Sequence, residues 1–315
     1  MRNYFDMSDA ERSAIVALGE GLYELGLDDA RGELREGFGG DAANTAVMAA
    51  EMGGTARIVG RVGDDALGRR LLAFWKHRGV GTEHVILDPS RPTGIYVNRR
   101  GADGARRFDY HRTGSAGSAV DEADVARVPL DHVACVHFTG IGVAISPTSA
   151  AACSALVRRA RREGARISFA VNLRPRLAPS LDQLRDAAAA ADVVFTSTED
   201  AELLFESLDA AVGTLSRSAE ELVVTDGERG ATVYSHGATV HHAPPPVDVV
   251  DAAGAGDALA GAYLAARVRG DSETAALAEG VVAGALSCRA FGCAASYPSR
   301  AEVRARCATT GGRTR

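Results

Sequence analysis

Short apolar runs alternate with longer amphipathic or alanine-rich stretches along most of the chain. Each run is brief enough for one strand and is bounded by glycine or charged residues, a pattern typical of parallel strands that are covered on both faces. The runs are residues 13–19, 57–62, 132–138, 167–171, 192–196 and 222–225. Their alternation with helical segments predicts an α/β domain built on a doubly wound, mostly parallel sheet flanked by helices. Ligands of such a sheet bind at the carboxyl ends of the strands.

The stretches between the apolar runs predict the helices. A glycine loop at 37–40 leads into an alanine-rich helix, which ends before Gly53 and Gly54 because glycine is a poor helix former. Asp64 and Asp65 open a second helix. The remaining expectations are an end of that helix at His77, a hairpin at 231–241, helices at 255–269 and 272–291, and a frayed tail at 308–315.

Three polar segments do not fit the main sheet. Residues 22–36 alternate loosely and are rich in charge, and 93–97 and 106–112 flank a turn signal at 101–104. Together they predict a small β-sheet that projects from the core and acts as a lid over the ligand edge. The expected bounds are residues 13–307 for the domain and about 22–37 and 91–113 for the lid segments inserted in it.

Composition narrows the class of protein. The chain has 315 residues, 46% of them hydrophobic and 24% charged, which is ordinary for a globular protein with a sizeable core. A net charge of -6 argues against nucleic acid as the main partner. The polar start of the chain is unlike a secretory signal, and no apolar run approaches the roughly 20 residues that span a bilayer. Five scattered cysteines favour reduced thiols over disulfides or zinc, so we expect a cytoplasmic protein without membrane partners.

The stretch from Gly254 to Asp257 carries the first candidate chemistry. Gly254, Ala255 and Gly256 have almost no side chain, so a ligand can approach their backbone closely. The helix that follows starts with unpaired N–H groups and a partial positive charge, which suit a phosphate or a developing anion. A carboxylate beside an anion site is unusual unless it handles a proton. The alternative is a glycine-rich turn in which Asp257 only caps the helix.

A second glycine stretch near the N-terminus completes a pattern. Gly39 and Gly40 are followed by Asn44, and the Gly-Ala-Gly-Asp sequence at 254–257 comes late in the chain. In this order the two motifs resemble those of the ribokinase-like (PfkB) carbohydrate kinases. The resemblance implies a ribokinase-like fold and ATP-dependent phosphorylation of a sugar hydroxyl. It also implies that Asp257 is the base and that the 254–256 backbone binds the phosphoryl group.

Further stretches look most like the 2-keto-3-deoxygluconate kinases of that family. They are residues 37–41, 110–119, 139–147 and 172–177. The resemblance implies that 2-keto-3-deoxygluconate is phosphorylated on its primary hydroxyl. It places hydroxyl contacts at Gly39, Gly40 and Asn44, and the acid end of the substrate among Tyr96, Tyr110, Arg112 and Arg174.

The same resemblance describes the phosphate-donor side. It implies ATP and Mg²⁺ as cofactors and, because family members often pair through the lid, a homodimer or higher homo-oligomer. The metal contact falls on Asp200, through water. The residues expected at the nucleotide are Ser197, Thr225, Gly227, Gly230, Gly254 and Gly256.

The arginines bear on substrate class independently of the resemblance. A guanidinium suits forked recognition of a planar carboxylate, so Arg112 and Arg174 favour a sugar acid over a neutral hexose. The alternative is that both lie in surface ion pairs, each worth at most about 1 kcal/mol. A kinase for a neutral sugar such as fructose or ribose stays open at this point. So does a non-catalytic sugar-binding regulator.

Asp257 cannot simply deprotonate an alcohol. The pKa of an aspartate is near 4 and that of an alcohol is close to that of water, about 15.7. Full deprotonation before attack would therefore cost roughly 16 kcal/mol. The proton has to move late, as the loose phosphoryl transition state makes the oxygen acidic. Asp257 thus mainly orients the hydroxyl, while the backbone at 254–256 and Mg²⁺ neutralise the transferring group.

Several positions depart from the family pattern. Ala170 stands where these kinases usually have an acid, and the segment 197–200 keeps an acid but lacks the amide of an Asn-x-x-Glu motif. Asp226 lies where the nucleotide loop often carries a basic pair. Cys293 falls where similar kinases place an aspartate near the substrate. These departures bear on substrate and nucleotide affinity and leave the expected base in place.

Overall fold

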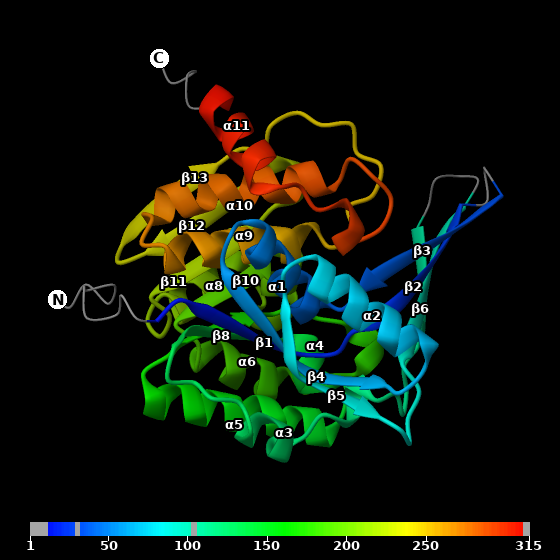
Figure 1. Cartoon of the computed structure of the whole chain (residues 1–315). Coiled ribbons are helices and arrows are strands. Elements are labelled where there is room, and N and C mark those ends of the chain that lie inside the picture. Colours follow the sequence, from blue (N-terminus) through cyan, green and yellow to red (C-terminus); the bar gives the residue numbers. More distant parts are fainter. Residues whose placement is uncertain (1–11, 29–31, 102–105, 311–315) are drawn as a thin grey trace.

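The computed structural model describes residues 12–28, 32–101 and 106–310, which form two β-sheets of different size (Figure 1). Helices cover both faces of the larger, nine-stranded sheet. Its strands are β1 (Ala14–Leu18), β4 (Thr55–Gly63), β5 (Gly81–Asp88), β8 (Val133–Thr139), β9 (Arg166–Ala170), β10 (Val193–Ser197), β11 (Glu221–Thr225), β12 (Ala231–Ser235) and β13 (Ala238–His242).

The strand order of the large sheet is β13-β12-β11-β10-β9-β8-β1-β4-β5. All neighbours from β11 to β5 pair in parallel, whereas β12 and β13 add an antiparallel hairpin at one edge. The predicted doubly wound, mostly parallel fold is therefore confirmed. The order reverses between β1 and β8, and this switch point leaves a crevice at the carboxyl ends of the central strands.

Two helical layers enclose the large sheet because its strands are apolar on both sides. In β1, Ile15 and Ala17 join one core cluster, and Val16 and Leu18 join the other. The first layer contains α1 (Asp41–Glu51), α2 (Ala66–His77), α9 (Ala255–Val268), α10 (Glu273–Ser287) and α11 (Arg300–Thr310). The second contains α3 (Glu122–Ala126), α4 (Gly140–Ala144), α5 (Pro147–Glu163), α6 (Leu181–Ala189), α7 (Thr198–Phe205) and α8 (Leu208–Leu215).

A separate four-stranded sheet projects from one side of the molecule (Figure 1). It contains β2 (Leu22–Asp28), β3 (Glu33–Gly39), β6 (Gly94–Arg100) and β7 (Arg106–His111), in the order β3-β2-β6-β7. The inner pair, β2 and β6, is parallel, and both outer pairs are antiparallel. The predicted small projecting sheet is thus present, and we call it the lid. Most of the turn expected at 101–104 lies outside the described residues.

Some elements differ from the sequence-based expectation. β5 was not predicted, because polar side chains interrupt its apolar pattern and only Asp88 is fully buried. β3 continues through Gly39, so the loop expected at 37–40 shrinks to the single residue before α1. The last long helix ends at Ser287 rather than at 291. Conversely, α11 includes residues 308–310 of the expected tail, and the rest of that tail lies outside the described residues.

Two global features follow from these elements. Within residues 12–28, 32–101 and 106–310, no helix combines the length and the apolar character that crossing a membrane requires. Cys135, Cys153, Cys288 and Cys293 are buried thiols. Burial raises the pKa of all four, and to about 12 for Cys135 and Cys153, so these side chains behave as small apolar groups.

Candidate active site

The two glycine stretches meet where α1 and α9 begin. The N-cap of α1 is Gly40, with a φ of 110°, and the N-cap of α9 is Gly254, with a φ of 76°. Glycine adopts such angles without steric penalty. A Cβ on Gly40 would lie 2.1 Å from the carbonyl oxygen of Glu20, so a larger residue does not fit. The glycines therefore allow two helix N-termini to lie beside the turn that follows β1.

A cavity of about 380 Å³ opens between these helix N-termini and the lid. Its volume lies in the range of small-ligand sites. The predicted residues that line it are Gly40, Asn44, Tyr96, Tyr110, Arg112, Arg174, Gly254, Ala255, Gly256 and Asp257. Gly39 lies behind the wall, where an added Cβ would come within 2.6 Å of the Tyr96 hydroxyl. We call this space the acceptor cavity.

Asp257 lies in the first turn of α9, at the floor of the acceptor cavity. Asn44 donates to its Oδ2 at 2.9 Å, and Asn172 donates to its Oδ1 at 3.4 Å. Burial raises the pKa of Asp257 well above its ordinary value, and the nearby Asp41 carboxylate raises it further. The two amides hold the carboxylate toward the cavity, which is the arrangement a general base requires.

Asp41 is a floor residue that sequence reasoning did not single out. It occupies the first turn of α1, where its Oδ1 accepts the N–H of Ala42 at 2.8 Å. Its Oδ2 accepts from Asn172 at 3.1 Å. Asn172 itself has a φ of 36°, an unusual backbone angle for a residue with a side chain. The available signal was that Asp41 directly follows the glycine pair.

Glu20 and Arg112 form a buried ion pair on the wall of the cavity. Arg112 donates to Glu20 Oε1, and its guanidinium lies over the Tyr110 ring, 4.7 Å from the centroid. Burial raises the pKa of Glu20 from 4.5 to about 7, although Arg112 opposes the shift. Among the described residues, Glu20 Oε2 has no hydrogen-bond partner. Arg112 thus already faces a carboxylate within the protein, and this partner, placed between two glycines after β1, was missed in the sequence.

Arg174 differs from Arg112 in its surroundings. It is exposed, and its Nη1 donates to the carbonyl oxygen of Leu173 at 3.0 Å. No carboxylate in the described part of the chain forms an ion pair with it. Arg174 is therefore the cation at this cavity that has the most freedom to meet an anionic ligand.

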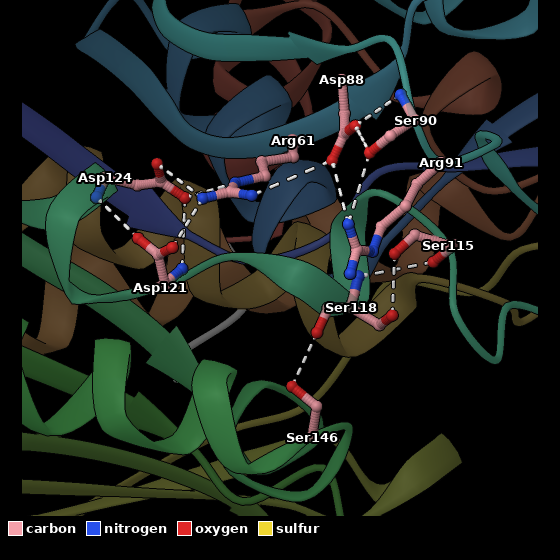
Figure 2. A network of polar contacts seen from close by, with 9 residues as sticks. All are labelled: Arg61, Asp88, Ser90, Arg91, Ser115, Ser118, Asp121, Asp124 and Ser146. Carbon is pink, nitrogen blue, oxygen red and sulfur yellow. Dashed lines mark hydrogen bonds and ion pairs between the residues drawn. The ribbon is translucent and has the colours of Figure 1, made fainter.

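A second arginine, partly buried, contacts the chain that follows β7 (Figure 2). Arg61 on β4 donates to Asp124 at 2.6 Å and to Asp121 at 2.8 Å. Figure 2 shows these contacts close to the turn at 115–118, whose last carbonyl accepts from Ser146 at 2.6 Å. Asp121 and Asp124 also form a reciprocal capping box at the start of α3. We call this the Arg61 network; its arginine and two aspartates lie outside the acceptor cavity.

Asn98 on β6 connects the lid to the loop before α9. Its side-chain amide donates to Glu24 Oε1 on β2 at 2.8 Å and to Asp251 Oδ2 at 3.2 Å. Asp251 in turn accepts the N–H of Ala253 at 3.1 Å and that of Gly292 at 3.1 Å. These three side chains are at most 3% exposed. The base of the lid and the glycine loop of α9 are therefore one hydrogen-bonded unit.

Cys293 lines the cavity beside this unit. Its Sγ lies 3.3 Å from the Tyr96 hydroxyl, and its N–H donates to Glu24 Oε2 at 3.4 Å. Burial raises the pKa of the thiol well above its usual value. The position for which the resemblance implied an aspartate thus borders the acceptor cavity, and it carries a neutral, weakly polar thiol.

Comparison with known families settles the class of protein. Residues 13–300 match the profile of the pfkB family of carbohydrate kinases. The chain belongs to this family. The resemblance inferred from the glycine motifs is confirmed, and the protein is a sugar phosphotransferase.

Relatives of this pfkB kinase differ in the sugar that they are named for. The chain is 34% identical to a 2-dehydro-3-deoxygluconokinase of Thermoproteus tenax over 306 residues, 92% of this chain and 93% of that one. It is 30% identical to a probable fructokinase-4 of Arabidopsis thaliana, over 82% and 83% of the two chains. A fructokinase from Xylella fastidiosa, solved with bound ATP, superposes with a TM-score of 0.86 at 25% identity, covering 95% of this chain and 99% of that one.

Four of the residues predicted at the nucleotide, Ser197, Thr225, Gly227 and Gly230, lie at or after the carboxyl ends of β10 and β11, outside the acceptor cavity, whereas Gly254 and Gly256 line that cavity. Ser197 accepts the N–H of Asp200 at 3.0 Å and caps α7. Thr225 ends β11. Gly227 and Gly230, with φ of 52° and 98°, bound a short turn whose tight geometry favours glycine. The missing amide of the Asn-x-x-Glu motif is thus replaced by a helix cap.

Two other departures of this kinase have local explanations. Asp226 makes a two-bonded ion pair with Arg229, in which both N···O distances are 2.5 Å. The hydrogen bond from Arg229 lowers the pKa of Asp226, so the acid is paired within its own loop. Ala170 ends β9, is 7% exposed and packs in the hydrophobic core, at the position where the resemblance implied an acid.

Asp200 is the expected metal contact of the pfkB kinase. Its Oδ2 accepts the N–H of Leu173 at 3.1 Å, and burial raises its pKa. Mg²⁺ keeps several waters and takes one or two carboxylates, so a single acid fits a contact through water. Within the described ranges no three His, Cys, Asp or Glu side chains form a group able to hold a metal directly.

Proposed function

We propose that this pfkB kinase transfers the γ-phosphoryl group of ATP to the primary hydroxyl of 2-keto-3-deoxygluconate, forming the 6-phosphate. The observation that carries the proposal is the separation of opposite charges along the site: the Asp257 carboxylate lies at the floor of the cavity, and the Arg174 guanidinium lies at its mouth. The 34% identity to a 2-dehydro-3-deoxygluconokinase over most of both chains supports the same substrate. ATP as donor is supported by the fructokinase solved with ATP.

Charge is distributed unevenly along the site. The acids of the acceptor cavity are Glu20, Asp41 and Asp257. A wider cleft of about 1340 Å³ continues outward along β7 and shares Tyr110, Arg112 and Arg174 with the cavity. The basic side chains along this cleft are Arg91, Arg107, His111, Arg112, Arg174 and Arg176. Such a field orients an acceptor with hydroxyls at one end and a carboxylate at the other.

The proposed reaction uses Asp257 to aim the acceptor hydroxyl. As the acceptor oxygen bonds to the γ-phosphorus, the bond from that phosphorus to the β–γ bridging oxygen breaks, and ADP leaves with the bonding electrons. The hydroxyl proton passes late to Asp257, because only the transition state makes it acidic enough. Mg²⁺, contacted through water by Asp200, would neutralise charge on the phosphates. The first turn of α9, with Gly254, Ala255 and Gly256, would stabilise the transferring group.

A kinase for a neutral sugar such as fructose is the second candidate. Glu20 already neutralises Arg112, which leaves Arg174 as the main partner for a substrate carboxylate. Cys293 also places a thiol on the cavity wall, at the position where the resemblance implied an aspartate. Both features reduce the expected difference in binding affinity between a sugar acid and fructose. A non-catalytic sugar-binding regulator is disfavoured because Asp257 faces the cavity with two amide partners.

The test is an ATP-consumption screen of the purified protein with 2-keto-3-deoxygluconate, fructose, ribose and nucleosides, with and without Mg²⁺. We expect the highest kcat/KM for the sugar acid and no turnover without the metal. Faster turnover of fructose or ribose would establish the second candidate. No turnover on any acceptor would support the regulator. Light scattering in the same buffer tests the homodimer that we also propose.

A further inference from the structure

Three polar side chains from distant parts of the chain meet at the floor of the acceptor cavity. The amide nitrogen of Asn172 lies 3.1 Å from Asp41 Oδ2 and 3.4 Å from Asp257 Oδ1. An amide nitrogen carries two hydrogens, so it can serve one carboxylate with each. Asn172 therefore bridges two acids that would otherwise repel each other across the floor.

Asp41 has a hydrogen-bond donor at each of its two carboxylate oxygens. It occupies the first turn of α1, where the unpaired N–H groups and the helix dipole favour an anion. The N–H of Ala42 donates to its Oδ1 at 2.8 Å, in addition to the contact from Asn172. Asp257 has the amides of Asn44 and Asn172 as partners, and its own burial and the nearby Asp41 carboxylate raise its pKa.

The surroundings of Asp257 determine how a neighbouring charge acts on it. Burial and Asp41 raise its pKa, whereas Asn44, Asn172 and Arg174 lower it. The groups facing it from the segment after α10 are the Cys293 thiol and the Tyr297 hydroxyl, and burial raises the pKa of both. Below Asp41, burial lowers the pKa of His137 on β8 to about 4, so that ring is neutral. The charged groups acting on Asp257 at neutral pH are therefore those of Asp41 and Arg174.

We propose that Asp41 is a positioning residue for catalysis, whose negative charge across the Asn172 amide keeps Asp257 a stronger base toward the acceptor hydroxyl. The inference rests on the proposed role of Asp257 in phosphoryl transfer. It differs from a role in which Asp41 simply binds an acceptor hydroxyl. A charge effect changes the pH dependence of turnover, whereas a lost hydroxyl contact changes KM.

The test is the Asp41→Asn variant, which keeps the shape of the side chain and removes the charge. We expect the acidic limb of its kcat–pH profile to move down by about one pH unit, because a like charge is removed from the pair. The plateau kcat should fall severalfold and KM for the acceptor should change less than twofold. Glu51→Gln, at the other end of α1, removes the same charge away from the cavity and should leave the profile unchanged.

Asp41→Ser provides a second variant if the amide disturbs the floor, because its hydroxyl can still accept the N–H of Ala42. An acidic limb that stays in place in both variants would overturn the proposal. So would a tenfold rise in KM without a shifted limb, which would make Asp41 a hydroxyl ligand instead.

A measurement without turnover separates this inference from the proposed function. Carbon-13 NMR of labelled aspartate carboxyls follows their titration in the free protein, and the resonance lost in Asp257→Asn identifies Asp257. We expect that resonance to titrate about one pH unit lower in Asp41→Asn. An unchanged titration would refute the charge coupling even in an active kinase. A shifted titration with no turnover on any acceptor would instead refute the proposed function.

Discussion

Arg61, whose side chain is 18% exposed, and Arg112, whose side chain is 8% exposed, both face carboxylates, but their surroundings differ. The Arg61 guanidinium meets Asp121 and Asp124, which also satisfy each other through the capping box of α3. Arg112 meets only Glu20, whose second oxygen has no hydrogen-bond partner among the described residues. The first group lies outside the acceptor cavity and the second lines it.

This difference in hydrogen bonding distinguishes a polar group that stabilises the fold from one that is available to a ligand. A buried polar atom without a partner is unfavourable, so natural structures keep one mainly where function requires it. Glu20 Oε2 and the remaining nitrogens of Arg112 border a cavity that a polyhydroxylated ligand can enter. The Arg61 guanidinium is instead paired with Asp121 and Asp124 and lies outside the acceptor cavity. Substitutions in the two regions should therefore affect different measurements.

The largest effect on the cavity side is expected from Asp257→Asn. Turnover should fall by at least about a thousandfold, or about 4 kcal/mol in the activation barrier, because the hydroxyl loses the group that aims it and accepts its proton. Thermal stability should stay the same or increase, since a desolvated carboxylate is removed. Steady-state kinetics and thermal unfolding measure both. Asp271→Asn, beyond the other end of α9, is the control, and turnover within tenfold of wild type would contradict the role of Asp257.

The largest effect on the network side is expected from Arg61→Met. Asp124, whose side chain is 2% exposed, then keeps a buried charge without its cation, which costs about 3–5 kcal/mol. Urea unfolding measures the loss, and KM of the folded fraction should not change. Arg69→Ala removes an exposed pair with Asp64 and should cost less than about 1 kcal/mol. Equal losses of unfolding free energy in the two variants would contradict the stabilising role of the Arg61 network.

Glu20→Gln should change the pH dependence of stability. The pKa of Glu20 is raised from 4.5 to about 7 in the folded protein, so its contribution to stability is present below about pH 4.5 and is lost as the pH rises through about 7. The total change is about 3 kcal/mol for a shift of this size. Wild type should lose that increment between the two pH values, and the variant should not. Parallel unfolding curves of the two proteins at both pH values would contradict the shift.

The smallest expected effect comes from Arg174→Ala. Loss of the exposed guanidinium should raise KM for a sugar acid about tenfold, or about 1.4 kcal/mol, and leave KM for fructose within about twofold. Steady-state kinetics with both acceptors measures the two values. Arg176→Ala, which removes a neighbouring exposed arginine of the outer cleft, is the matched control and should have a weaker effect. Equal changes for both sugars would favour the neutral-sugar candidate.

The fold and the family could be predicted from the sequence because their signals are local. Gly40 and Gly254 adopt positive φ angles at helix N-termini, and glycine is the residue type that favours such angles, so the residue type itself is a signal. The apolar runs likewise predict the parallel strands, because each run is a continuous local pattern. β5 was not predicted, because a half-exposed edge strand shows no clear alternation of apolar and polar residues.

Much of the floor and wall of the cavity could not be predicted in this way. Glu20 becomes important only because the chain returns to place Arg112 against it, 92 positions later. Asp41 and Asn172 are 131 positions apart and meet through the strained backbone angle of Asn172. Such partners follow from tertiary packing, which no local pattern encodes.

The Asn98 contacts have a consequence for how this enzyme responds to change at a distance. Asp251 orients the peptide directly before Gly254, and the same carboxylate is tied to β2 and β6 through Asn98. The lid strands and the loop that leads into α9 therefore share one set of hydrogen bonds. A substitution of Asn98 should therefore disturb two parts of the cavity wall together, the lid strand that carries Tyr96 and the loop that leads into Gly254.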